Sequence, residues 1–300
     1  MLTKPWTLRV GFAIGGVLIA IGLLLTVTVG PVVWDAFTWP VNGIAMGVLV
    51  ALLVMMHALR RRVYVFHFLS TNAAAIPAIA YVVVLTIVMG LTRQSAEGHG
   101  LHNMLTFWPF VLAYVYLTIV LGLVVLRRLC AFKPSQWRRD IPFLLNHLGL
   151  FLTLTTATLG NADMKRVKMI TYVGQLEWRA INARMEVVEM PIAIQLRRFI
   201  LETYDDGSPR RYASELEVVT RTGKDFLATV DVNHPLKVDG WKIYQYGYDT
   251  AMGADSQTSI LEFVRDPWLP AVYAGIFMML AGALLMFLGR RTFPEISAKS

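Results

Sequence analysis

Six segments of this chain are long and apolar enough to cross a lipid bilayer as helices. A hydrocarbon core of ~30 Å requires ~20 helical residues. The predicted spans are residues 9–30, 40–59, 72–92, 105–127, 141–160 and 267–289. Their interiors contain no Asp, Glu, Lys or Arg. Only 16% of all residues are charged, whereas soluble domains contain about 25%. The pattern therefore predicts a multi-pass integral membrane protein.

Basic residues in the loops predict the orientation. The first apolar run is longer than the core of a typical signal peptide, and no A-x-A site follows, so we interpret it as an uncleaved helix. An inside N-terminus leaves only Arg93 in the two short external loops. It places the following residues in the cytoplasm: Lys4, Arg9, Arg60, Arg61, Arg62, Arg127, Arg128, Lys133, Arg138, Arg139, Arg290, Arg291 and Lys299. This asymmetry predicts that both termini are cytoplasmic in a bacterial inner membrane. It also explains the net charge of +8 without a nucleic-acid partner.

Residues 161–266 differ in composition from the rest of the chain. They contain 14 Lys and Arg against 16 Asp and Glu, and no cysteine. Runs rich in β-branched and aromatic residues predict strands over residues 192–202, 212–220, 226–232, 241–248 and 259–264. Turn sequences separate them at 205–209, 221–224 and 239–240. We therefore expect an antiparallel sheet or sandwich outside the cytoplasm.

The predicted fold is thus an α-helical bundle of six transmembrane helices, with a β-rich extracytoplasmic domain inserted between helices five and six. The expected divisions are an N-terminal three-helix region (1–104), helices four and five (105–160), the β-rich domain (161–266), and the last helix with a cytoplasmic tail (267–300).

His147 is the most informative candidate for a binding site. It lies within the fifth predicted span, ~10 Å along the helix from its cytoplasmic end. Ionisable side chains at such depth usually face a partner, a cofactor or the interior of the bundle. A neutral imidazole with an apolar wall suits an axial haem ligand, and Phe143, Leu144, Leu150 and Phe151 are close enough in sequence to form that wall. A hydrogen bond to another helix is the structural alternative.

The other histidines give weaker signals. His57 and His67 are interpreted as residues of the membrane interface, and His234 as a turn residue at the end of a strand. His99 and His102 have metal-ligand spacing with Glu97 nearby, but a solvated loop explains them better. Cys130 is interpreted as an ordinary free thiol. Known phosphate-loop, zinc-protease and serine-hydrolase motifs are absent from the sequence.

Several short motifs, taken in order, resemble the ResB (CcsB) family of system II cytochrome c maturation. The resemblance extends over roughly 105–290 and is carried by Phe107-Trp-Pro-Phe110, Trp137 to Phe151, Gly207-Ser-Pro209 with Arg210 to Val219, Val232-Asn-His-Pro-Leu236, Gly240 to Tyr248 and Asp266 to Gly275.

The resemblance implies that the chain works with a CcsA-type partner to carry haem outward and attach it to CxxCH sites of apocytochrome c. His147 matches the histidine that ligates haem b in transit, and it would be the metal ligand here. Asn146, however, replaces the preceding phenylalanine of the family's setting. The second axial histidine would come from the partner.

The resemblance assigns no catalytic residue to this chain. The tryptophan-rich motif of the CcsA half is not reproduced by Trp34, Asp35 and Trp39. We therefore interpret the chain as the non-catalytic or co-catalytic half of a haem lyase. We also expect the partner half to be a separate polypeptide, because no further helix follows Arg290.

Two other functions remain open from the sequence. A membrane b-type cytochrome that carries electrons would need two histidines at similar depth on facing helices. A structural envelope scaffold would use His147 only for packing.

Overall fold

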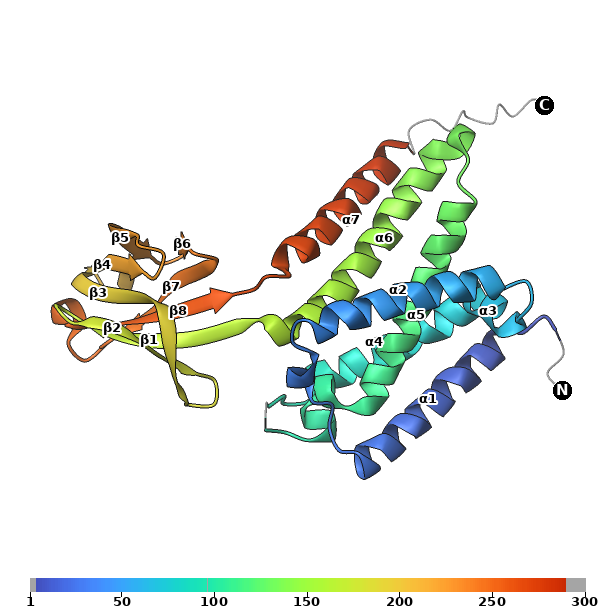
Figure 1. The fold of residues 1–300 in the computed structure, drawn as a ribbon, viewed down its shortest axis with the longest axis horizontal. Coiled ribbons are helices and arrows are strands. Elements are labelled where there is room, and N and C mark those ends of the chain that lie inside the picture. Colours follow the sequence, from blue (N-terminus) through green and yellow to red (C-terminus); the bar gives the residue numbers. More distant parts are fainter. Residues whose placement is uncertain (1–3, 96, 290–300) are drawn as a thin grey trace. The chain divides into compact units, whose positions relative to one another are not determined.

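The computed structural model describes residues 4–95 and 97–289. The chain divides into two compact units, one drawn from residues 1–162 and 268–300 and the other consisting of Asp163–Pro267. The first unit is helical and the second is a β-sheet (Figure 1). The predicted tail beyond Arg290 lies outside the described residues.

Within the described residues, six helices are long and apolar enough to cross a membrane. The predicted number of spans is therefore confirmed, and the chain is a multi-pass membrane protein with a β-rich unit. The six are α1 (Leu8–Thr28), α2 (Val41–Leu59), α4 (Asn72–Leu91), α5 (Trp108–Cys130), α6 (Trp137–Gly160) and α7 (Leu269–Gly289). A short helix that the sequence did not predict, α3 (Tyr64–Leu69), lies between α2 and α4.

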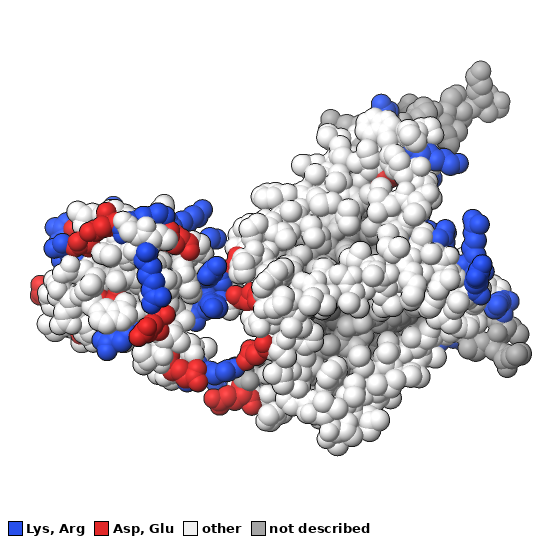
Figure 2. Space-filling view, viewed as in Figure 1, with Lys and Arg blue, Asp and Glu red and all other residues white. Residues whose placement is uncertain are grey.

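Charge is confined to the ends of this helical unit. The side chains along its body are uncharged on the face shown, and Lys and Arg gather at one end (Figure 2). That end holds the start of α1, the α2–α3 connection and the α5–α6 connection. Hydrocarbon tolerates apolar side chains and excludes charge, so this distribution agrees with membrane-spanning helices.

Close backbone approach joins α6 to α7, which run antiparallel and side by side (Figure 1). A Cβ atom added at Gly149 would lie 2.6 Å from the carbonyl oxygen of Gly275, and one added at Gly282 would lie 2.4 Å from Asn146. Small residues let membrane helices approach until van der Waals packing holds them. The two helices that flank the β-rich unit in sequence are therefore tightly paired.

The β-rich unit is one antiparallel sheet of eight strands, in the order β5-β4-β3-β2-β1-β8-β7-β6. The strands are β1 (Lys165–Tyr172), β2 (Leu176–Asn182), β3 (Val187–Thr203), β4 (Pro209–Thr220), β5 (Asp225–Asp231), β6 (Leu236–Val238), β7 (Trp241–Tyr248) and β8 (Thr258–Arg265). β1 and β8 are central neighbours, paired from Lys165 with Arg265 to Tyr172 with Thr258.

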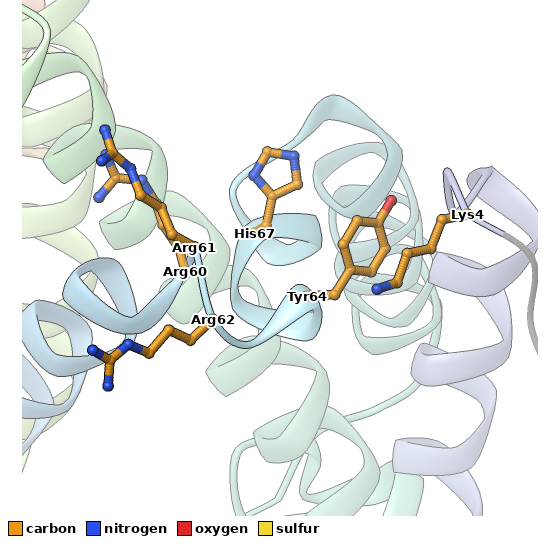
Figure 3. Close-up of a pocket in the computed structure, with 6 residues that line it drawn as sticks. All are labelled: Lys4, Arg60, Arg61, Arg62, Tyr64 and His67. Carbon is orange, nitrogen blue, oxygen red and sulfur yellow. The ribbon is translucent and has the colours of Figure 1, made fainter.

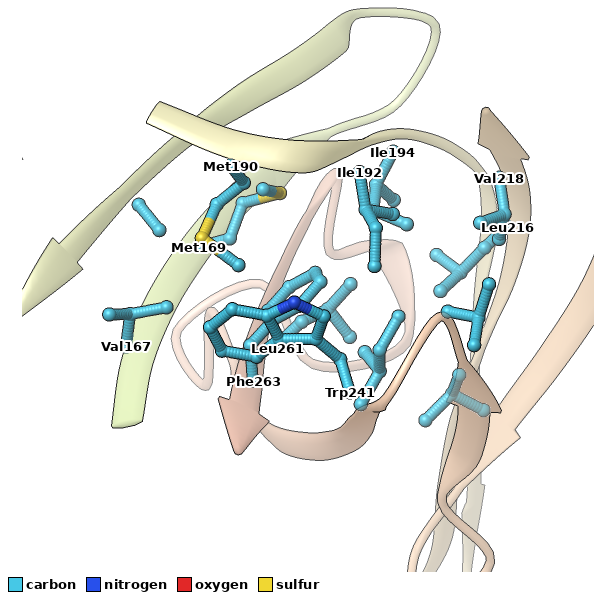
Figure 4. Close-up of a cluster of buried hydrophobic side chains, with 14 of the residues drawn as sticks. Val167, Met169, Met190, Ile192, Ile194, Leu216, Val218, Trp241, Leu261 and Phe263 are labelled. Atoms are coloured by element: carbon cyan, nitrogen blue, oxygen red, sulfur yellow. The ribbon is translucent and has the colours of Figure 1, made fainter. Parts of the chain in front are cut away.

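The sheet curls around one hydrophobic core (Figure 4). In the longer strands alternate residues point inward, as in β8, where Leu261 and Phe263 are fully buried. Ile192, Ile194 and Leu216 on the opposite strands are equally buried. Burial of apolar surface contributes ~25 cal/mol per Å², so this core stabilises a unit that has no disulfide.

The five strands predicted from the sequence correspond to β3, β4, β5, β7 and β8, and all are confirmed. The predicted turns are confirmed too, because Gly207, Gly223 and Gly240 have φ angles of 81°, 84° and 81°, a region that favours glycine. β1, β2 and β6 were not predicted.

Candidate functional site

His147 lies near the middle of α6, ten residues after the helix begins at Trp137, or about 15 Å along the axis. Its ring is partly buried. Nδ1 lies 2.9 Å from the carbonyl oxygen of Phe143, one turn earlier. A carbonyl oxygen only accepts, so Nδ1 carries the proton and donates it. Nε2 therefore keeps its lone pair, and within the described residues no hydrogen bond occupies it.

A stack of side chains holds the His147 ring. Phe143 lies parallel to it, with ring centres 3.8 Å apart and planes inclined by 17°. Arg128, on α5, lies over the face of the Phe143 ring, with its guanidinium carbon 5.3 Å from the ring centre. Arg128 is held in turn by Asp140, whose carboxylate oxygen is 2.5 Å from the guanidinium. The imidazole is thus fixed in both tautomer and orientation by α5 and α6 together.

Asp140 and Arg128 were not predicted as site residues. The sequence predicted that the fifth span begins at residue 141, whereas α6 begins at Trp137 and includes Asp140 in its first turn. Hydropathy detects only the apolar part of a helix, so it misses a turn in which the carboxylate is neutralised by an arginine of another helix. The Asp140 side chain is only 1% exposed. Its position just before the apolar run, with arginines ending the previous helix, was the available signal.

The predicted apolar wall is divided by the structure. Phe143 contacts the His147 ring, and Leu150 is 37% exposed on the outer surface of the helical unit. Phe151, however, packs against the cluster of Leu53 and Leu123 between helices. Phe151 also borders an apolar cavity of about 200 Å³ among α2, α5 and α6, which His147 does not line.

Asn146 belongs to a different contact. Its amide nitrogen donates to the carbonyl oxygen of Pro142 at 2.8 Å and lies near Met286 of α7. The residue that departs from the family's setting therefore serves the α6–α7 interface.

The other histidines lie near the ends of helices or in connecting segments. His57 ends α2 as expected for an interface residue, but it is only 8% exposed, and its Nδ1 has no hydrogen-bond partner within the described chain. His102 bonds the carbonyl oxygen of Arg93 within its loop. His234 forms a turn with Asp231, as predicted. Across residues 4–95 and 97–289, no group of three or more His, Cys, Asp and Glu is arranged to hold a metal ion.

The motif residues in the β-rich unit build its core and turns. Gln245 is 7% exposed, and its amide nitrogen donates to Ser259 and to the carbonyl oxygen of Gly247. Ser214 donates to the side-chain oxygen of Gln245 at 2.7 Å. Trp241 lies in the hydrophobic core. These residues are satisfied internally, so they define the fold of the unit.

The fold and the site define a multi-pass membrane protein with a β-rich unit and with a histidine held in one tautomer within an apolar helix. Residues 136–262 match the model of the ResB-like family. The predicted resemblance is therefore confirmed for this segment, which contains His147 and most of the β-rich unit. The match is narrower than the predicted range of 105–290.

Curated relatives carry the same family's name. The cytochrome c biogenesis protein CcsB of Prochlorococcus marinus strain NATL1A is 28% identical over 108 residues, which are 36% of this chain and 24% of the relative. CcsB of strain MIT 9303 is 26% identical over 155 residues, which are 51% of this chain and 29% of the relative. The matched regions thus span only 24% and 29% of these two relatives' own length.

Among solved structures, the cytochrome c heme lyase CcmF is similar with a TM-score of 0.39 and 12% identity, over 95% of this chain and 46% of that one. A TM-score this low does not establish a shared fold.

Proposed function

We propose that this chain is a ResB-like subunit of a cytochrome c maturation complex. With a CcsA-type partner it binds haem b, carries it out of the cytoplasm and presents it to apocytochrome c. The observation that carries the proposal is His147, a half-buried imidazole with a free Nε2, inside the segment that matches the ResB-like family. The curated CcsB relatives support the same role.

The residues around His147 suit haem. Nε2 of a neutral histidine is a good ligand for haem iron, and a hydrogen bond from Nδ1–H to a carbonyl raises its basicity. Phe143 stacks on the ring, and Leu150, about one turn further along α6, offers exposed apolar surface. Haem supplies the iron and the vinyl groups that take the cysteine thiols, whereas this chain binds and orients it. A histidine of the partner would supply the other ligand of the iron.

The proposed orientation follows from the charged end of the helical unit. Because Lys and Arg collect on the cytoplasmic side of inner-membrane proteins, this end faces the cytoplasm of a bacterial cell and both termini lie there. The β-rich unit then lies outside, where it meets the apocytochrome. No catalytic residue is assigned to this chain, so we regard it as the non-catalytic or co-catalytic half of the haem lyase.

Deletion of the chain tests this function. We expect loss of holo c-type cytochromes, with b-type cytochromes unchanged, and recovery when the wild-type chain is supplied. Unchanged c-type cytochromes would refute the proposal. Loss of both types would favour a general scaffold.

Purification of the chain alone tests the electron-carrier alternative. Stable haem with two axial ligands in the absence of any partner would favour a b-type cytochrome, whereas the proposal predicts little haem without the CcsA-type subunit.

A further inference from the structure

A hollow of about 450 Å³ opens at the positively charged end of the helical unit (Figure 3). It is formed by the segment before α1, the α2–α3 connection and α3, all outside the segment that matches the ResB-like family. Figure 3 shows His67 between Arg60 and Arg61 on one side and Tyr64 on the other. The lining residues are Lys4, Arg60, Arg61, Arg62, Tyr64 and His67.

The cations of this hollow are not neutralised by the protein. None of its lining residues is acidic. Within the described residues, no ion pair with a carboxylate involves Lys4, Arg60, Arg61 or Arg62. Arg60 bonds only the carbonyl oxygen of His57, at 2.7 Å. The nearest acid in sequence at this end, Asp140, is already paired with Arg128. Several like charges around one hollow create a positive potential that favours an anion.

One wall of the hollow is fixed in place. Lys4 Nζ lies 4.5 Å from the centre of the Tyr64 ring. The Tyr64 hydroxyl accepts the backbone N–H of Trp6 at 3.2 Å. The Trp6 ring packs edge-on against Tyr64 and Phe68, with centres 5.2 and 5.3 Å away. The N-terminal segment is therefore attached to α3, and Lys4 is held at the rim.

We propose that this hollow binds a phosphate group. Arginine presents a planar fork of donors that matches two phosphate oxygens, and basic pockets at the ends of membrane helices are suited to lipid headgroups. The phosphate belongs to an anionic phospholipid or to a soluble phosphate compound. The site is independent of the haem proposal, and it gives the N-terminal part of the helical unit a ligand of its own.

The test uses the full chain purified in detergent, with binding followed by thermal unfolding and by native mass spectrometry. The probes are phosphatidylglycerol, phosphatidylcholine, and inorganic phosphate or pyrophosphate. We expect phosphatidylglycerol or the soluble phosphates to bind and to raise the unfolding temperature, with phosphatidylcholine much weaker. A response to phosphatidylglycerol alone identifies a lipid, and a response to soluble phosphate identifies a soluble ligand.

Variants locate the binding. Each neutralised cation should weaken it about fivefold, so the double substitution Lys4→Gln with Arg61→Gln should weaken it about 25-fold. Arg61→Lys, which keeps the charge, should retain most of the binding. The matched control is Lys133→Gln with Arg138→Gln, two exposed cations at the same end but outside the hollow. Equal binding of all probes by the wild type, or an equal loss in the control, would overturn the proposal.

Discussion

Replacing Asp140 by asparagine removes the carboxylate that holds Arg128 against Phe143. Asp140 is 1% exposed and Arg128 26%. Leaving one partner of a buried ion pair uncompensated costs ~3–5 kcal/mol. Arg128 retains some contact with water and the new amide can still accept a hydrogen bond, so we expect a loss of about 2–3 kcal/mol.

The assay is equilibrium unfolding of the full chain in mixed micelles, with rising denaturing detergent and helix content followed by circular dichroism. Arg139→Gln is the matched control. Arg139 Nε also lies 3.3 Å from the Asp140 carboxylate, but the Arg139 side chain is 66% exposed. Removing this second ion pair should therefore cost less than about 1 kcal/mol of unfolding free energy. Asp140→Asn combined with Arg128→Gln should be milder than the sum of the single changes. If Asp140→Asn costs no more than Arg139→Gln, the ion pair does not hold α5 and α6 together.

Two further predictions concern the helix pair and the β-rich unit. Gly149→Ala places a Cβ atom 2.6 Å from the Gly275 carbonyl oxygen and should cost about 1–3 kcal/mol in the same unfolding assay. Gly47→Ala meets open space and should be neutral or stabilising; equal effects would contradict the close α6–α7 contact. In β2, hydrogen bonds from Arg179 lower the pKa of Glu177 to about 2. Because this pKa is lower in the folded than in the unfolded state, its stabilisation is present above about pH 4.3 and is lost as the pH falls toward 2. Glu177→Gln should therefore lower the free energy of unfolding by about 1 kcal/mol at pH 6 and by progressively less in acid. Hydrogen exchange of the β2 amides measures this difference. A stability difference between Glu177→Gln and the wild type that does not change with pH would contradict this prediction.

The sequence predicts the parts of this fold that repeat a simple pattern. Six apolar runs gave six spans, and β-branched alternation gave the strands from β3 onward, apart from the three-residue β6. β1 alternates buried Val167, Met169 and Thr171 with outward Lys168 and Ile170. It was missed because the strand begins with charged residues and its alternation is short. β2 has a single fully buried position, Ala180. Such strands form because they pair with neighbouring strands, and this pairing is not local in sequence.

The candidate site was predictable in its histidine but not in the residues that hold that histidine in place. His147 stood out because an imidazole inside an apolar helix needs a reason. The pairing of Arg128 with Asp140 depends on how α5 and α6 pack. The basic hollow likewise combines Lys4 with residues more than fifty positions later.

The haem spectrum of the chain co-purified with its CcsA-type partner tests the central claim most directly. His147→Ala should remove most of the haem absorbance, and added imidazole should restore it by occupying the vacated ligand position. The control His102→Ala, in a loop outside the helices, should leave the spectrum intact. A His147→Ala complex that folds and keeps the wild-type spectrum would show that His147 does not ligate haem.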